Sequence, residues 1–428
     1  YRSQDTATVF LLDAGDRWTG NPYVDMAPES GQPIIELMTE LRYDVATYGN
    51  HEFDRGQAHL ETRTAEAGFP VVRANMQALS SPISQPDPYI TLVSMGGTRI
   101  AVLGLITNFI NGHPDGTDEV YENLLFESPY DAAGTYTWLK DENDVLIGLT
   151  HIGDDADTVL ARQVPVFDLI IGGHTHVPIT EPYVIGDTYV TQTGKSLKYA
   201  GVTKLTMKGR KLASIENHLV RLDTIARHPA YTAMVEKYYD NEELNRPIGR
   251  LATVAGKDGM ANMLTDIVRQ ETKSDFAFYH IGGIRVHNMT EGPVSKADIF
   301  AIDPFESRMV KVQMTLPQIR ELIINKFNDT QNPKESHRED IYPSGMNYTI
   351  VTDEQGEAVD VTFDHRYYPE RGKTYSVAMS DYMYKIYKFD KPEITETSAL
   401  VTDILTAYFS AGKPVTPDNR KRVTIRVR

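Results

Sequence analysis

Four short segments of the chain carry aspartate, asparagine or histidine directly after an apolar run. They are Gly15-Asp16, Gly49-Asn50-His51-Glu52, Thr150-His151 and Gly173-His174-Thr175-His176. Ligands of open α/β sheets collect beyond the carboxyl ends of the strands, where all four segments are expected to lie. Each residue type also occurs in ordinary turns and helix caps, so the prediction of a metal site depends on the conjunction of the four.

Composition limits the chemistry that these segments can support. The chain has 428 residues and no cysteine, so any metal must be held by His, Asp, Glu or Asn, which suits manganese, magnesium, zinc or iron. The net charge of −16 argues against binding to a nucleic-acid polymer. No apolar run approaches the roughly 18 residues that cross a membrane, so no membrane span is expected.

The elements that must position these residues alternate along the first half. Short β-branched runs between helical patterns are typical of strands buried on both faces, which indicates an α/β layered domain. We predict strands at 8–12, 43–48, 99–105, 144–149 and 167–171, and helices at 33–41 and 55–67.

The length exceeds what one hydrophobic core usually supports, so two domains are expected. We place the first at residues 1–225, a linker at 226–246 built on a helix over 228–244, and an α+β domain at 247–428. In the last domain we expect helices at 260–271 and 317–327, and strands at 276–279, 348–351, 358–363, 374–379 and 422–427.

In their order and spacing, the four segments resemble the motifs of the calcineurin-like metallophosphoesterases. Within that group, Asp275–Arg285 and Ile302–Phe305 are similar to the C-terminal domain of the 5′-nucleotidase / UDP-sugar hydrolase family. The resemblance implies an αββα layered sandwich joined by a helix to an α+β substrate-binding domain. It also implies two divalent metal ions.

The resemblance assigns the metal ligands residue by residue. Asp16 would bridge the two metals, and Asn50, His151 and His174 would complete the shell of one of them. His176 would bind the other metal. The family also has an Asp-x-His motif upstream of Gly-Asp, and only fifteen residues precede Asp16 here. We therefore expect that a preceding strand is absent from this sequence, or else that metal occupancy is weak or single.

The resemblance also implies catalytic roles. His51 would lie over the leaving group as a proton donor, and Asp54 would orient its ring. Glu52 and Phe53 would be structural.

The second half would bind the substrate. Arg285 would meet an anionic group, and Phe305 and Tyr382 would stack on a base. Two positions depart from the family: His280 stands where an Asn is usual, and Lys388 lies where a Gly-Gly-Asp-Gly segment usually supplies a carboxylate. The candidate substrate-binding residues are therefore Arg285, Phe305, Tyr382, His280, Gly282 and Gly283.

The expected function is two-metal hydrolysis of a nucleoside monophosphate to nucleoside and phosphate, with a small-molecule nucleotide as the partner. Alternatives are a cyclic-nucleotide phosphodiesterase, a UDP-sugar hydrolase, a thiosulfohydrolase-like relative and a nucleotide-binding protein that has lost its chemistry. A metal-dependent amidohydrolase barrel also uses a His-x-His pair, but usually on an early strand. Family analogy suggests a periplasmic or extracytoplasmic location, and the sequence leaves the oligomeric state open.

Overall fold

The computed structural model describes residues 2, 7–85, 87–331, 336–364 and 373–428. The chain divides into two compact units. The first unit comprises Tyr1–Thr19 and Ala27–Tyr238, and the second comprises Gly20–Met26 and Tyr239–Arg428. The sequence-based boundaries at 225 and 246 stay a prediction.

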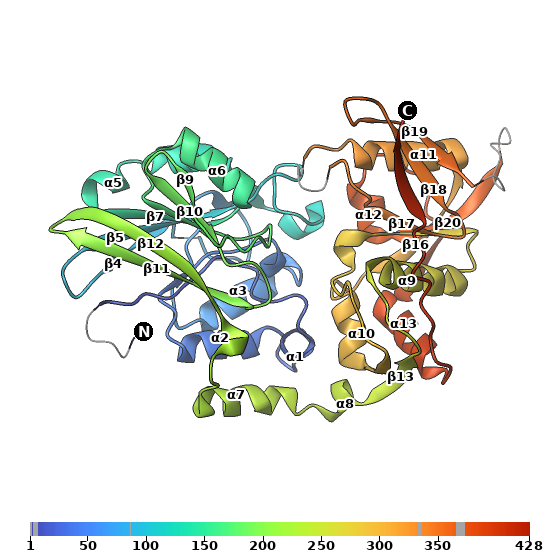
Figure 1. Cartoon of the computed structure of the whole chain (residues 1–428), viewed down its shortest axis with the longest axis horizontal. Helices are drawn as coiled ribbons and strands as arrows, with labels where there is room; N and C mark the ends of the chain where they lie inside the picture. The colour runs from blue at the N-terminus through green and yellow to red at the C-terminus, as the bar shows by residue number, and fades with distance from the viewer. Residues whose placement is uncertain (1, 3–6, 86, 332–335, 365–372) are drawn as a thin grey trace. The chain divides into compact units, whose positions relative to one another are not determined.

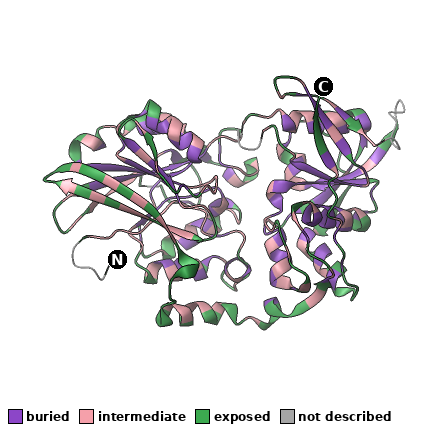
Figure 2. Cartoon of the chain, viewed as in Figure 1, coloured by how far each residue is buried: buried purple, intermediate pink, exposed green. Residues whose placement is uncertain are grey.

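A six-stranded sheet forms the centre of the first unit (Figure 1). Its four inner strands are parallel, and the two edge strands are antiparallel to their neighbours. The strands β5 and β7 are almost wholly buried, as Figure 2 shows, which agrees with their continuous apolar sequences. In sheet order the strands are β4 (Tyr89–Val93), β5 (Arg99–Ile106), β7 (Val145–His151), β8 (Leu169–Gly172), β10 (Thr188–Gln192) and β9 (Tyr183–Ile185).

The two strands nearest the N-terminus are much shorter than expected. The runs predicted as strands at 8–12 and 43–48 form only β1 (Leu12–Asp13) and β2 (Val45–Ala46), which pair in parallel. The side chain of Asp44 explains part of the difference, because its Oδ2 accepts the backbone N–H of Leu11 at 2.7 Å. A carboxylate thus replaces a strand partner at that position.

Helices and smaller strand pairs complete the first unit. Three helices of nine or ten residues belong to this unit: α2 (Gln32–Glu40), α3 (Gln57–Glu66) and α6 (Asp154–Gln163). The helices predicted at 33–41 and 55–67 are confirmed as α2 and α3. The remaining elements are α4 (Pro129–Thr135), α5 (Leu139–Glu142), α7 (Pro229–Tyr239), the pair β3 (Met76–Ala78) with β6 (Leu124–Phe126), and the hairpin of β11 (Tyr199–Lys208) with β12 (Lys211–Arg221).

The single helix predicted over 228–244 is wrong. The chain forms α7 and then α8 (Glu242–Asn245), separated at residues 240 and 241. Asn241 has extended backbone angles, and its side chain accepts the Leu244 N–H, so it begins a new helix as an N-cap.

The second unit is α+β, as expected. A five-stranded mixed sheet has the order β17 (Ile341–Ser344), β14 (Phe276–His280), β20 (Thr374–Ser380), β16 (Arg308–Thr315) and β21 (Glu396–Leu400). The long helix α9 (Lys257–Thr272) contacts β14 and β17. The other elements are α1 (Pro22–Asp25), α10 (Lys296–Ile302), α11 (Leu316–Phe327), α12 (Asp381–Ile386), α13 (Val401–Ser410), the pair β13 (Pro247–Leu251) with β15 (Gly292–Ser295), and the sheet of β19 (Ala358–Phe363), β18 (Tyr348–Thr352) and β22 (Val423–Val427).

The helix α1 is the one early segment that belongs to the second unit among the residues that the structure describes. Across those same residues, every helix is too short or too polar to span a bilayer.

Candidate metal centre and substrate-binding residues

The first candidate site lies at the carboxyl ends of β1, β2, β7 and β8 in the first unit. Close backbone approach at Gly49 makes the site compact. A Cβ on Gly49 would lie 2.2 Å from Asp16 Oδ1 and 2.6 Å from His151 Cε1, closer than any side chain tolerates. Glycine at this position therefore lets the backbone after β2 contact two candidate ligands.

Four of the predicted metal ligands lie together. The Nε2 atom of His151 is 3.1 Å from Asp16 Oδ2, and the Nδ1 atom of His174 is 3.0 Å from Asn50 Oδ1. The rings of His151 and His174 are 5.3 Å apart between centroids. Asn50 and His151 are 3% and 1% exposed, so these groups are withdrawn from bulk water.

The charges of Asp16, His151 and His174 depend on one another. The Nδ1–H of His151 donates to the backbone oxygen of Ala14 at 2.6 Å, so Nε2 is the ring nitrogen that faces Asp16. Burial lowers the pKa of His151, but attraction to Asp16 outweighs burial and raises it. Burial, followed by repulsion from His151, lowers the pKa of His174 to about 3 and keeps its ring neutral. Burial opposes ionisation of Asp16, but attraction to His151 and His51 outweighs burial and holds the pKa of Asp16 well below its usual value.

The separations between these atoms match the edges of a metal coordination shell. Two ligands about 2.1 Å from one ion and at right angles to each other lie about 3.0 Å apart. Both observed pairs have that spacing, which is also the spacing of an ordinary hydrogen bond or ion pair. Within the described residues, no group of three or more His, Cys, Asp or Glu side chains is placed to hold a metal ion, so the structure joins these residues as two pairs. Asp16, Asn50, His151 and His174 stay the predicted ligands of one divalent ion.

The second predicted metal position is less complete. His176 has a positive φ of 59° in the turn after β8, and its charge acts on His174. Asp16 and His176 are the two residues of this sequence that are predicted to bind the second metal ion.

A carboxylate clamp that the sequence analysis treated as structural holds the two loops together. The Glu52 side chain is fully buried and accepts the backbone N–H groups of Asp16, Arg17 and Gly49 at 2.8, 2.7 and 2.5 Å. Arg17 donates to Asp13 Oδ1 and to the Thr47 backbone oxygen at 2.8 and 2.7 Å. Glu52 and Arg17 thereby fix the positions of the loops that carry Asp16 and Asn50.

The predicted acid and its orienting group are in contact. The short helix η1 (His51–Phe53) follows Asn50, and His51 Nδ1 lies 2.9 Å from Asp54 Oδ2. With Nδ1–H donating to that carboxylate, Nε2 is the atom that can carry a second proton. The backbone N–H of His51 donates to Asp16 Oδ1 at 3.0 Å, which links the acid to a metal ligand.

The candidate substrate-binding residues lie in the second unit. The guanidinium carbon of Arg285 is 5.3 Å from the centroid of the Phe305 ring, within range of a cation–π interaction. The loop that carries Phe305 is held by Asp303, whose carboxylate accepts the Tyr279 hydroxyl at 2.8 Å and the Ser307 hydroxyl at 3.0 Å. This buried network was not predicted from the sequence.

His280 and Tyr382 form a second ring pair. Their rings are stacked at 4.6 Å with an interplanar angle of 20°, and His280 Nδ1 lies 3.3 Å from Ser380 Oγ. A Cβ on Gly283 would lie 2.6 Å from His280 Cε1, whereas one on Gly282 would meet its nearest neighbour at an ordinary 3.5 Å. Of the two glycines, Gly283 is the one whose close contact requires glycine. Lys388 forms an ion pair with Asp329 at 3.6 Å.

Comparison with known families matches both units. Residues 2–178 match the calcineurin-like phosphoesterase family, and residues 238–386 match the 5′-nucleotidase C-terminal domain. Calcineurin-like metallophosphoesterases are phosphoric ester hydrolases with a dinuclear metal centre.

The chain is also similar to several named proteins. It is 25% identical to the trifunctional nucleotide phosphoesterase protein YfkN of Bacillus subtilis over 77% of this chain and 26% of that protein. It is 23% identical to the 5′-nucleotidase of Vibrio cholerae over 72% of this chain and 66% of that protein. It thus spans about a quarter of the Bacillus relative and about two thirds of the Vibrio one.

Solved structures have the same fold. A 5′-nucleotidase precursor from Thermus thermophilus superposes with a TM-score of 0.84 at 20% identity, covering 99% of this chain and 91% of that chain. The sulfate thiohydrolase SoxB of Thermus thermophilus gives a TM-score of 0.81 at 15% identity, covering 97% and 78%. With both domain families matched in order, the chain belongs to the calcineurin-like metallophosphoesterases that carry a 5′-nucleotidase C-terminal domain.

Proposed function

We propose that this chain hydrolyses nucleoside monophosphates to nucleoside and phosphate. The observation that carries the proposal is the contact in the first unit of Asp16 with His151 and of Asn50 with His174, together with the His51–Asp54 pair. That arrangement supplies a metal-binding edge and a proton donor, the two parts that hydrolysis of a phosphomonoester requires.

The chain's own residues divide the work. Asp16, Asn50, His151 and His174 would hold one divalent ion, and Asp16 and His176 would contribute to a second. When bound, such ions lower the pKa of water and offset charge on the phosphoryl oxygens. Glu52 fixes the positions of the loops that carry Asp16 and Asn50, because its carboxylate accepts three of their backbone N–H groups. We propose manganese, zinc, iron or magnesium as the metal.

His51 donates a proton to the leaving group. As water attacks phosphorus, the bond from phosphorus to the ribose 5′ oxygen breaks, and that oxygen takes a proton from His51 Nε2. One proton of the attacking water passes to solvent, and His51 is reprotonated from solvent. Asp54 stabilises the charged ring through its contact with Nδ1, which holds the ring in one orientation.

The second unit would hold the nucleoside. A base stacked on Tyr382 would use the ring face opposite to His280, because His280 covers the other face. Arg285 and Phe305 form a charged and aromatic pair for an anionic group and a ring. His280 stands at a position where the family usually has an Asn. Its imidazole replaces an amide there, so His280 is a candidate determinant of base preference.

We test this proposal with a substrate panel measured as phosphate release. We expect the highest kcat/KM with AMP or another nucleoside monophosphate, and a large fall in kcat for His51→Asn with KM little changed. His218→Asn is the matched control, because His218 is exposed on β12, and it should leave both constants unchanged. Hydrolysis of cyclic nucleotide or UDP-glucose alone would refute the monophosphate assignment. Nucleotide binding without turnover in manganese would refute hydrolysis altogether.

The proposal also includes the cellular location of the protein. By analogy with the family, we place the protein in the periplasm or otherwise outside the cytoplasm. Fractionation of the source cells, with phosphatase activity as the readout, tests that location.

A further inference from the structure

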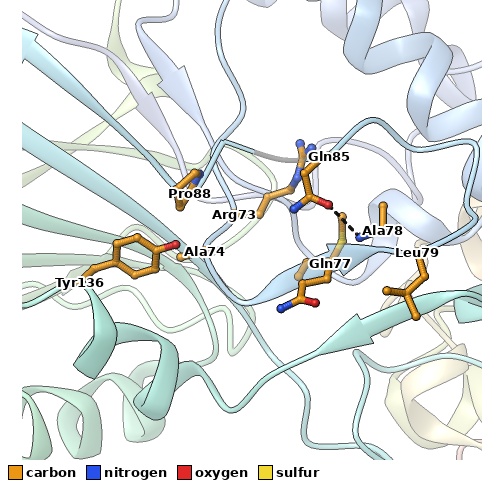
Figure 3. Close-up of a pocket in the computed structure, with 9 residues that line it drawn as sticks. Arg73, Ala74, Gln77, Ala78, Leu79, Gln85, Pro88 and Tyr136 are labelled. Carbon is orange, nitrogen blue, oxygen red and sulfur yellow. Dashed lines mark hydrogen bonds between the residues drawn. The ribbon is translucent and has the colours of Figure 1, made fainter.

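A pocket of about 360 Å³ lies in the first unit, among residues to which no role was assigned above. Figure 3 shows it beside β3, with Tyr136 at one side and Leu79 at the other. Its volume is at the low end for sites of small organic ligands. The lining residues are Arg73, Ala74, Met76, Gln77, Ala78, Leu79, Gln85, Pro88 and Tyr136.

The charged group of this pocket is Arg73, which is only 4% exposed. Its guanidinium carbon lies 4.2 Å from the centroid of the Tyr48 ring, which fixes the group on one side. Two of its nitrogens lie 3.5 Å from the backbone oxygens of Val71 and Ser84, at the outer limit of a hydrogen bond.

Arg73 lacks a close counter-ion. Within the described residues, no carboxylate oxygen lies within 4 Å of its guanidinium, and its buried Nε has no hydrogen-bond partner. Glu61 and Asp87 attract it only from longer range. A guanidinium has five N–H donors, and two contacts of 3.5 Å satisfy them poorly. The buried guanidinium of Arg73 can therefore donate further hydrogen bonds, and it lies at the wall of the pocket.

Neutral polar groups complete the lining. The Oε1 atom of Gln85 accepts the Ala78 N–H at 3.3 Å, so its NH₂ end is directed to other acceptors (Figure 3). The hydroxyl of Tyr136 points towards Ala74 in the same view. The pocket thus combines one full positive charge with an amide donor, a hydroxyl and apolar side chains.

We propose that this pocket binds a small organic monocarboxylate, with the carboxylate on Arg73. A planar carboxylate matches the fork of a guanidinium. The lining includes a single cationic residue, which balances one negative charge and not the two of a phosphate monoester. Met76, Leu79 and Pro88 provide contact for a short apolar tail. This site does not depend on the proposed hydrolase activity.

Calorimetric titration of the full chain with butyrate, at constant ionic strength set with sodium chloride, tests the proposal. We expect saturable binding of one butyrate, and binding of its neutral isostere butyramide at least about tenfold weaker. Arg73→Gln should weaken butyrate binding by about tenfold or more, and Tyr136→Phe by about threefold. Tyr183→Phe, at a partly exposed tyrosine on β9, is the matched control and should bind like the unsubstituted protein.

Each alternative outcome has a defined meaning. Equal binding of butyrate and butyramide, or no saturable binding of either, would overturn the proposal. Tighter binding of inorganic phosphate than of butyrate would overturn the carboxylate assignment. Circular dichroism reports whether Arg73→Gln folds. If it does not fold, the comparison of Tyr136→Phe with Tyr183→Phe decides, and identical affinities would contradict the site.

Discussion

Replacing Gly49 by alanine is the sharpest perturbation of the candidate metal centre. The added Cβ would lie 2.2 Å from Asp16 Oδ1 and 2.6 Å from His151 Cε1, and ordinary contact begins at 3.4 Å. Relieving the overlap requires shifts of about 1.2 Å for Asp16 and about 0.8 Å for His151, measured against that contact distance. Both groups are proposed ligands, so the substitution deforms the metal site without removing a ligand.

The expected loss follows from those shifts. A misplacement of about 1 Å in a catalytic constellation costs about 100-fold in rate, or about 2.7 kcal/mol of transition-state stabilisation. We therefore expect Gly49→Ala to lower kcat/KM for AMP about 100-fold and to weaken manganese affinity by at least about tenfold.

The assay is phosphate release as a function of manganese concentration, with a thermal melt for each variant. Gly134→Ala is the control, because a Cβ at Gly134 in α4 meets nothing within 4 Å. It should leave activity and metal affinity unchanged and be neutral or stabilising by up to about 1 kcal/mol. Unchanged activity and manganese affinity in a folded Gly49→Ala protein would refute the assignment of Asp16 and His151 as ligands.

Three further predictions follow from contacts already described. Asp54→Asn should lower kcat about 10- to 100-fold without changing manganese affinity, because it disturbs only the orientation of His51; calorimetry showing lost metal binding would contradict that role. Glu52→Gln should destabilise the first unit by roughly 2–4 kcal/mol in urea unfolding, since an amide cannot accept all three backbone N–H groups; an unchanged midpoint would contradict the clamp. Burial raises the pKa of Asp303 to about 6, so the folded second unit binds more protons than the unfolded chain between about pH 4 and 6. Stability should therefore fall by roughly 3 kcal/mol as pH rises through that window, and Asp303→Asn should remove this slope from the pH-dependent melts; an equal slope in both proteins would contradict it.

The sequence is most informative about the first unit where chemistry coincides with strand ends. The ligand types after β7 and β8 follow continuous apolar runs, and both strands lie where those runs predict. The two-residue strands β1 and β2 were predicted too long, because periodicity does not reveal that the Asp44 carboxylate takes a backbone N–H of the neighbouring segment. The candidate ligands after β1 and β2 are predicted all the same, since their types and order do not depend on strand length.

Interactions between distant residues account for what the sequence does not predict. Glu52 lies next to His51, yet nothing local shows that its carboxylate accepts backbone groups 35 and 36 residues away. The stacking of His280 on Tyr382 joins residues about a hundred positions apart. Arg73 follows an apolar pair and reads as an ordinary strand-end residue, and its uncompensated burial against Tyr48 is visible only in three dimensions. Such contacts depend on packing, which one sequence does not specify.

Manganese titration of phosphate release from AMP tests the central claim most directly. The chain is first treated with chelator, and wild-type protein is compared with His174→Ala and with the exposed control His218→Ala. The account predicts that wild-type and His218→Ala are inactive after chelation and regain activity that saturates with manganese, whereas His174→Ala needs at least about tenfold more metal. Phosphate release that persists in chelator, or a His174→Ala curve that superposes on wild-type, would contradict the claim that this cluster holds the catalytic metal.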